Sequence, residues 1–140
     1  MAYNTILLKG DAIFKEAPAA GAITPGHLVI RNSSGNMIVN ATAGANTGKL
    51  FARENELLGK DIADAYASGD ECLFFIPQPG SEVYALVAAA ASAIVINDSL
   101  EAAADGTLRK LTSGTPLAKA LEAVDNSGGG SPARIVVEIL

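Results

Sequence analysis

The sequence predicts an all-β protein with one or two short helical turns, built from hairpins as a compact barrel-like or sandwich domain. Short apolar runs recur along the chain, and turns rich in Gly, Pro, Asn and Asp separate them roughly every 8–12 residues. The runs are enriched in β-branched and aromatic residues, which favour strands. The 140 residues fit one domain. We expect residues 1–19 to form an N-terminal strand or arm and residues 20–140 a single barrel-like domain.

Each predicted strand is an apolar run bounded by turn residues. In the last of them Ile135, Val137 and Ile139 alternate with more polar positions, as expected for a strand with one face on a core. The predicted strands, in order, are Thr5–Leu8, His27–Arg31, Asn36–Asn40, Leu50–Arg53, Glu71–Ile76, Glu82–Val87, Ala93–Ile96, Leu108–Leu111, Ala118–Ala123 and Ile135–Leu140.

Three dipeptides predict tight turns between strands. They are Ser34-Gly35, Pro79-Gly80 and Asp105-Gly106. Asp-Gly is the strongest of these signals, because both residues tolerate a positive φ.

Two regions favour helix locally. Leu57, Leu58, Ile62 and Ala65 recur at helical spacing, so a short helical turn is expected inside residues 54–67. The Ala-rich residues 85–105 favour either strand or helix, and the pattern does not choose between them.

Two stretches of the chain resemble one another. "PGHLVIRNSSGNMIVNATAG" followed by "LFARENEL" has the same order of signals as "INDSLEAAADGTLRKLTSG" followed by "PLAKALEA". Each contains a turn, a strand, a Gly-centred hairpin, a second strand and an aliphatic run with one basic residue. The pattern indicates either two equivalent hairpin units around one core or chance similarity in an Ala- and Gly-rich chain.

Charge argues against nucleic acids and membranes as partners. Ten basic and fifteen acidic residues give a net charge of −5, and the basic residues are scattered singly apart from Arg109-Lys110. Phosphate binding needs a basic stripe. The longest apolar run, residues 84–96, is shorter than the roughly 20 residues of a membrane span. The N-terminus lacks the pattern of a signal peptide, so we expect a soluble protein that is not exported by that route.

No group of residues predicts catalysis, a metal site or a cofactor site. Cys72 is the only cysteine and lies in an apolar run typical of a core. His27 is the only histidine, and its position after "TPG" predicts the start of a strand rather than a catalytic base. The loop "AGANTGKL" has three residues between its glycines and Leu50 after the lysine, so it lacks the phosphate-binding loop pattern. We therefore expect a protein that is not an enzyme.

The order of segments resembles the small head decoration, or cement, proteins of tailed bacteriophages. The likeness runs over residues 20–140 and is carried by "PxPGSEVYALVA", "ADGTLRKL", "GTPLAKALEAV" and the closing "ARIVVEIL". The Gly-Asp usual before the second strand is Asn97-Asp98 here, and the first unit has Gly26-His27 in its place. The resemblance implies a β-barrel or β-tulip fold. It also implies a capsid-stabilising protein on the outer surface of the virion, made in the bacterial host cytoplasm.

The same resemblance implies the partners. They are the major capsid protein and two further copies of this chain, arranged as a trimer at threefold or quasi-threefold junctions. An N-terminal arm would contact the shell, and its candidate residues are Tyr3, Ile6, Leu7, Leu8, Ile13 and Phe14. The alternative for this segment is an ordinary first strand of the barrel.

Two other functions are open to a domain of this composition. One is a small-molecule or carbohydrate-binding β-barrel, although the chain has no Trp and only three Tyr for sugar stacking. The other, the least supported, is a hydrolase that uses His27 with Cys72 or a serine.

Overall fold

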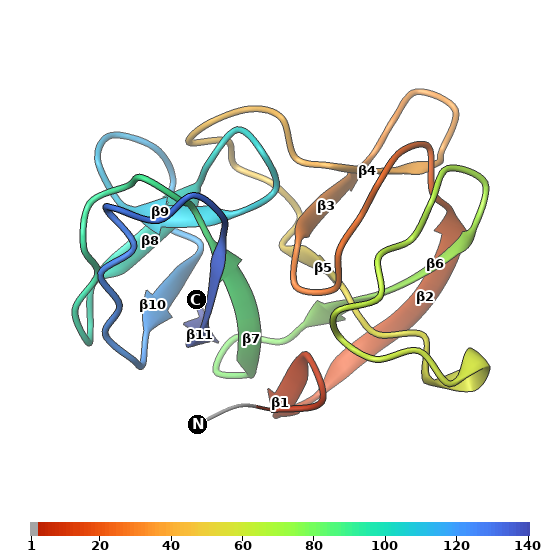
Figure 1. Cartoon of the computed structure of the whole chain (residues 1–140), viewed down its shortest axis with the longest axis horizontal. Helices are drawn as coiled ribbons and strands as arrows, with labels where there is room; N and C mark the ends of the chain where they lie inside the picture. Colours follow the sequence, from red (N-terminus) through yellow and green to blue (C-terminus); the bar gives the residue numbers. More distant parts are fainter. Residues whose placement is uncertain (1–2) are drawn as a thin grey trace.

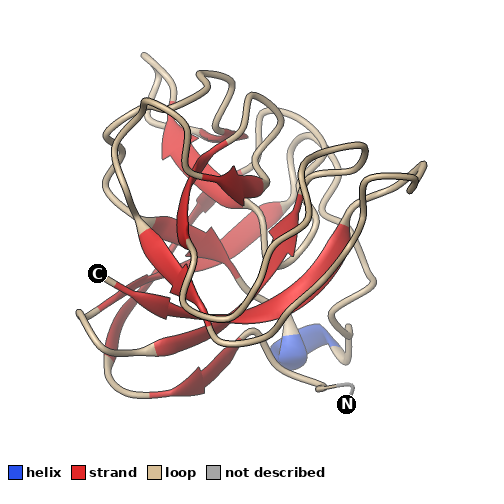
Figure 2. Ribbon diagram, turned by 90° about the vertical axis from the view of Figure 1, so that its left-hand side faces the viewer, coloured by secondary structure: helices blue, strands red, loops and turns tan. Residues whose placement is uncertain are grey.

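The computed structural model describes residues 3–140 and contains two β-sheets and a single turn of 3-10 helix (Figures 1 and 2). The predicted all-β class with a short helical turn is confirmed. In order, the elements are β1 (Leu7–Lys9), β2 (Ala12–Pro18), β3 (Leu28–Arg31), β4 (Met37–Val39), β5 (Leu50–Ala52), η1 (Glu56–Leu58), β6 (Glu71–Pro77), β7 (Glu82–Val87), β8 (Ser99–Ala102), β9 (Leu108–Lys110), β10 (Ala118–Ala120) and β11 (Ala133–Ile139).

The C-terminal half of the chain forms a closed five-stranded barrel. Its strands follow the order β7-β11-β10-β8-β9, and a parallel contact between Val87 and Leu108 joins β9 back to β7. Strand β1 pairs antiparallel with the remaining part of the β7 edge, where Leu7 lies opposite Val83. In Figure 1 this barrel occupies the left half of the molecule, with β1 below it.

The N-terminal half forms a second sheet with the order β2-β6-β5-β3-β4. Beyond the end of β2, Ala19 makes a parallel bridge to Met37 at the start of β4, and Ala20 donates its N–H to the Met37 carbonyl at 2.8 Å. The sheet is therefore curled, and its two edge strands, β2 and β4, meet only at the C-terminal end of β2. The rest of β2 stays at the edge.

The two sheets have the same connectivity. Strands β2, β3, β4, β5 and β6 are neighbours in the same order as β7, β8, β9, β10 and β11. The predicted turns at Ser34-Gly35 and Asp105-Gly106 are the tips of the equivalent hairpins, with Gly35 and Gly106 at φ 83° and 80°. The structure therefore supports two equivalent units and extends the sequence similarity to five strands in each.

Strand β6 belongs to both hydrophobic cores. Phe75 packs in the larger core with Leu28 and Phe51 of the second sheet and with the inward residues of the barrel. Phe74 faces the opposite side of the sheet and packs in the smaller core with Cys72. Both phenylalanines are fully buried, because successive residues of a strand point to opposite faces.

Several predicted elements differ from the structure. Residues 93–96 do not form the predicted strand, since Ile94 makes a single bridge, to Val124, and a turn begins at Ile96. Strands β2 and β8 are not among the ten predicted strands. Residues 12–18 belong to the segment expected to be a strand or an arm, and residues 99–102 belong to the Ala-rich stretch left open between strand and helix; both form strands, although "FKEA" and "SLEAAAD" have weak strand propensity. The helix-like spacing inside 54–67 yields only η1, which ends at Gly59 with a φ of 70°.

Gly106 lies where the two units touch. Its N–H donates to the Asn40 carbonyl at 2.9 Å, and its carbonyl accepts the Leu28 N–H at 2.7 Å. A Cβ at Gly106 would lie 2.8 Å from the Cβ of Val39, whereas a Cβ at Gly35 would meet nothing within 4 Å. Both glycines need a positive φ, but only Gly106 also needs the space.

Glu101 is a fully buried carboxylate on β8. It accepts hydrogen bonds from Arg109 Nε at 2.9 Å, Thr112 Oγ1 at 2.8 Å and the Gly114 N–H at 2.6 Å. It also forms an ion pair with Arg109 at 2.8 Å. The Thr112 hydroxyl, followed by the Gly114 N–H and Arg109, holds the pKa of Glu101 below its usual value against the effect of burial. Through its hydrogen bonds to Thr112 and Gly114, this carboxylate holds the loop after β9 against the barrel.

We expect Gly106→Ala to destabilise the protein more than Gly35→Ala. The left-handed conformation alone costs about 1–2 kcal/mol for a non-glycine residue, and the clash with Val39 adds about 1–3 kcal/mol at Gly106. Urea unfolding of the two variants measures the difference. Equal losses of unfolding free energy would contradict the close contact between the units.

We expect Glu101→Gln to lower stability at neutral pH and to matter less in acid. Because the folded pKa is lowered, the stabilising contribution of Glu101 is present above the unfolded value of 4.5 and is lost as the pH falls through the folded pKa. Urea unfolding at about pH 7 and about pH 3 tests this. Glu56→Gln is the control, because Glu56 is the exposed ion-pair partner of Arg53. A difference from wild type that stays constant with pH would contradict the assignment.

Candidate partner-binding surface

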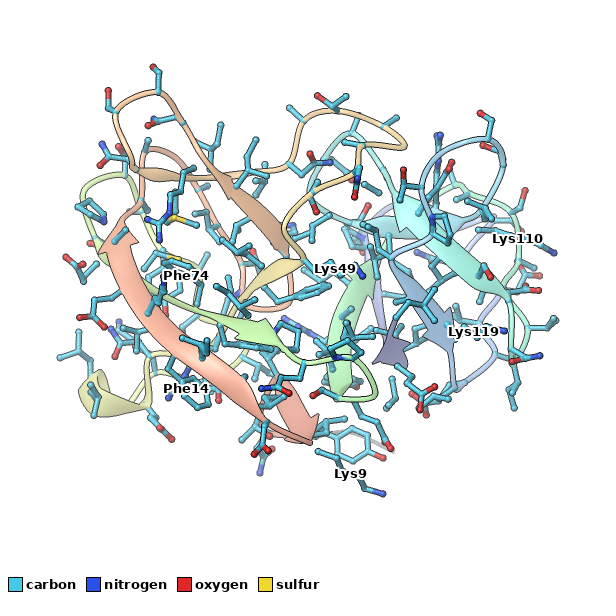
Figure 3. The ribbon with its side chains drawn as sticks, turned by 180° about the vertical axis from the view of Figure 1, so that it is seen from behind. Lys9, Phe14, Lys49, Phe74, Lys110 and Lys119 are labelled. Carbon is cyan, nitrogen blue, oxygen red and sulfur yellow. The ribbon has the colours of Figure 1, made fainter. Side chains whose placement is uncertain are left out.

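Four large apolar side chains are exposed at the open end of the second sheet. Ile13 and Phe14 on β2 are 57% and 54% exposed, and Leu57 and Leu58 on η1 are 81% and 72% exposed. Phe14, Leu57 and Leu58, together with Leu73 of β6, form what we call the apolar surface. Figure 3 shows Phe14 on β2 at the same end of the molecule as η1. Exposed apolar groups gathered in this way are typical of binding surfaces.

Phe14 is held in place by the side chains beneath and beside it. Its ring lies 6.3 Å from that of Phe75, which stacks in turn on Phe51 at 6.3 Å. The guanidinium of Arg53 lies 5.0 Å from the Phe14 ring centroid, and Arg53 forms a 2.6 Å ion pair with Glu56 of η1. A row of aromatic rings therefore anchors an exposed phenylalanine, and Arg53 links it to η1.

The outer edge of β2 is open along most of its length. The Asp11 carbonyl accepts the Gln78 N–H, and the Ala19 N–H donates to Asp70, so the odd-numbered residues of β2 bond to β6. The antiparallel pattern then turns the N–H and C=O groups of Ala12, Phe14 and Glu16 away from the sheet. Pro18 has no N–H and ends this row of donors.

A groove of about 460 Å³ runs beside the apolar surface. It is lined by Leu57 and Leu58 on η1, Leu73 and Glu71 on β6, Glu16 on β2, and Asn55. A second groove of about 320 Å³ lies next to Phe14 and is lined by Thr5, Leu7, Phe14, Arg53, Glu54 and Glu56. The loop between β5 and β6 therefore creates concave surface on both sides of η1.

The six residues predicted to contact a partner differ in their exposure to solvent. Ile13 and Phe14 are exposed, whereas Ile6 is fully buried in the larger core and its N–H donates to Glu54 at 3.1 Å. Tyr3 packs edge-on against Tyr84 with 5.1 Å between the rings. The two alternatives for the N-terminal segment are an arm and a strand. The structure has strands at residues 7–9 and 12–18.

The remaining two of the six, Leu7 and Leu8, lie on β1 and are half-buried. Leu57 and Leu58 were not predicted to contact a partner. Their spacing with Ile62 and Ala65 predicts a short helical turn, and in the structure that turn, η1, leaves both leucines exposed.

His27 is part of a turn. Its Nδ1 accepts the Thr24 N–H at 3.0 Å, and its own N–H donates to the Thr24 carbonyl at 3.0 Å. In the equivalent turn before β8, the Asp98 carboxylate accepts the Val95 N–H at 2.9 Å in the same way. Burial lowers the pKa of His27, although Asp105 acts in the opposite direction, and a neutral imidazole suits an acceptor at Nδ1. His27 therefore has the structural role of the aspartate in the other unit.

Cys72 is buried in the smaller core, and this burial, with a further effect of Glu71, raises its pKa to about 12. A thiol of this kind stays protonated at neutral pH and is a poor nucleophile. Within residues 3–140 no three His, Cys, Asp or Glu side chains gather as a metal site would require. No helix in the same range is long and apolar enough to span a membrane.

Comparisons with models of known protein families and with curated proteins find no match to this chain. The fold and the surface around Phe14 are the observations that bear on function.

We expect His27→Ala to lower the free energy of unfolding by about 0.5–2 kcal/mol, the usual cost of losing a side-chain acceptor for a turn or cap N–H. His27→Asn supplies a neutral oxygen in place of Nδ1 and avoids a new charge beside Asp105. It is expected to recover at least half of the loss. Thermal and urea unfolding at neutral pH measure both. An Asn variant as unstable as the Ala variant would contradict the structural role of His27.

Proposed function

We propose that this chain is a non-enzymatic decoration protein that binds the outer surface of a phage capsid and stabilises the head. The observation that supports the proposal most is the apolar surface on β2, η1 and β6, with the open edge of β2 beside it. The resemblance of residues 20–140 to phage head decoration proteins supplies the partner, the major capsid protein.

The proposed mechanism is passive and uses many weak contacts. Burying Phe14, Leu57 and Leu58 against a shell subunit removes apolar area from water, at roughly 1.5–3 kcal/mol for each fully buried side chain. The open N–H and C=O groups of β2 offer hydrogen bonds to an extended segment of the shell. A trimer that makes such contacts three times over one junction would bind far more tightly than one copy. Contacts that bridge neighbouring subunits would oppose their separation.

Packing inside the barrel favours a surface function over a ligand-binding barrel. The interior is filled by the larger core, which includes Leu100, Leu108, Ile135 and Val137, all buried. A small molecule or sugar enclosed inside the barrel would need open space there. The protein is proposed to act through its outer surface instead.

The test uses heads assembled from the capsid protein whose gene lies beside that of this chain. We expect the protein to sediment with these heads, and Leu57→Asp/Leu58→Asp to weaken binding at least about tenfold because two apolar contacts are lost. Val95→Asp/Ile96→Asp is the matched control, since these residues are also exposed but lie on the barrel. Light scattering should give a trimer of three times 14.2 kDa, in solution or on the head.

Two results would contradict the proposal. One is a gene neighbourhood without a capsid protein. The other is a loss of head binding that is the same for the control pair as for the η1 pair.

A further inference from the structure

The two units differ at one edge, and the difference indicates what the open edge of β2 can bind. Strand β7 holds the same place in the barrel as β2 holds in the second sheet. The outward N–H of Tyr84 on β7 donates to the Ile6 carbonyl at 2.7 Å, and β1 pairs antiparallel with this edge. The edge of β2 has the same alternation of outward groups. This molecule therefore already contains an example of an extended segment added to the equivalent edge.

The groove next to this edge has apolar walls. Leu57 and Leu58 project from η1, and Leu73 faces them from β6. A side chain with a long alkyl part would bury its stem against these three leucines.

Two carboxylates stand on the β-sheet side of the groove. In the pairing of β2 with β6, Glu16 lies opposite Leu73 and Pro18 lies opposite Glu71. Glu16 and Glu71 are therefore diagonal neighbours on one face of the sheet, at a separation that long side chains span. Among the groups that line this groove there is no cation. Of the nearby basic residues, Arg53 is paired with Glu56, and Lys60 lines the adjoining cleft.

The side-chain oxygen of Asn55, another residue of this groove, receives no hydrogen bond. Its Oδ1 is buried and makes no hydrogen bond, although Asn55 is the residue before η1 and could have capped it. A buried carbonyl oxygen without a partner costs free energy, and a rotation of the Asn55 side chain toward the groove would let a bound group donate to it and remove that cost. Both the carboxylates and this oxygen accept hydrogen bonds.

We propose that the groove binds a lysine or arginine side chain of a partner protein, carried on an extended segment that pairs antiparallel with β2. The alkyl stem lies along Leu57, Leu58 and Leu73. The charged head lies between Glu16 and Glu71, and the Asn55 side chain rotates on binding so that its Oδ1 accepts a hydrogen bond from this head. This inference rests on the proposed function only in taking the partner to be a shell protein, and its test does not require the shell.

The probe is the peptide Ac-Val-Thr-Lys-Thr-Val-NH2, with norleucine or glutamate in place of lysine as controls. Norleucine keeps the alkyl stem and removes the charge. In a titration of the ¹⁵N-labelled protein, we expect saturable shifts at Leu57, Leu58 and Leu73. We expect weaker binding by about fivefold for norleucine, the upper range for an exposed ion pair, and weaker binding still for glutamate. Added salt should reduce the preference for lysine.

The matched variants remove two carboxylates each. Glu16→Gln/Glu71→Gln should abolish the preference of the protein for the lysine peptide over the norleucine peptide. Glu82→Gln/Glu138→Gln changes the charge equally on the barrel, where these residues are paired across β7 and β11, and should leave the preference unchanged. Amide shifts away from the groove show that both variants remain folded.

Equal affinity for all three peptides, or shifts confined to another strand edge, would overturn the inference. So would a preference for lysine that survives Glu16→Gln/Glu71→Gln. Peptide selectivity without any binding to heads would instead contradict the proposed function and leave the groove assignment standing. Head binding together with unselective peptide binding would remove this inference alone.

Discussion

Phe74 and Phe75 are neighbours on β6, and they point into different cores because a strand alternates its faces. Phe75 joins the second sheet to the barrel, and Phe74 fills the hollow of the sheet itself. Both must find apolar neighbours, since burying a phenylalanine contributes roughly 1.5–3 kcal/mol relative to leaving it in water. The sheet therefore packs against the barrel on one side and curls around its own core on the other.

Duplication of a five-strand unit explains much of the rest. The barrel unit is closed by a contact between β7 and β9, and β1 covers the remaining edge of β7. The other unit has only the bridge from Ala19 to Met37, so β2 keeps open backbone groups next to Phe14. An uncovered edge of this length invites pairing with another strand. The exposed apolar residues lie beside this edge, which is why the proposed function is placed there.

Several buried or half-buried polar side chains hold turns and loops in place. His27 and Asp98 accept equivalent turn N–H groups in the two units, and Glu101 secures a loop with hydrogen bonds and an ion pair. Cys72 is a core side chain with a raised pKa. Asn55 is different, because its buried Oδ1 has no partner and it lines the groove at the apolar surface.

Local signals in the sequence determined the all-β class, the turns at Gly35 and Gly106, and the buried position of Cys72. These depend on backbone conformation and residue type within a few positions, which a sequence displays directly. Local signals left residues 12–18 open between a strand and an arm, and pairing with β6 makes them a strand. The resemblance to decoration proteins made Ile6 a candidate for a partner-binding arm, whereas the larger core encloses it. Only the tertiary structure brought Phe14, η1 and Leu73 together, because they meet through the packing of β6 and are far apart along the chain.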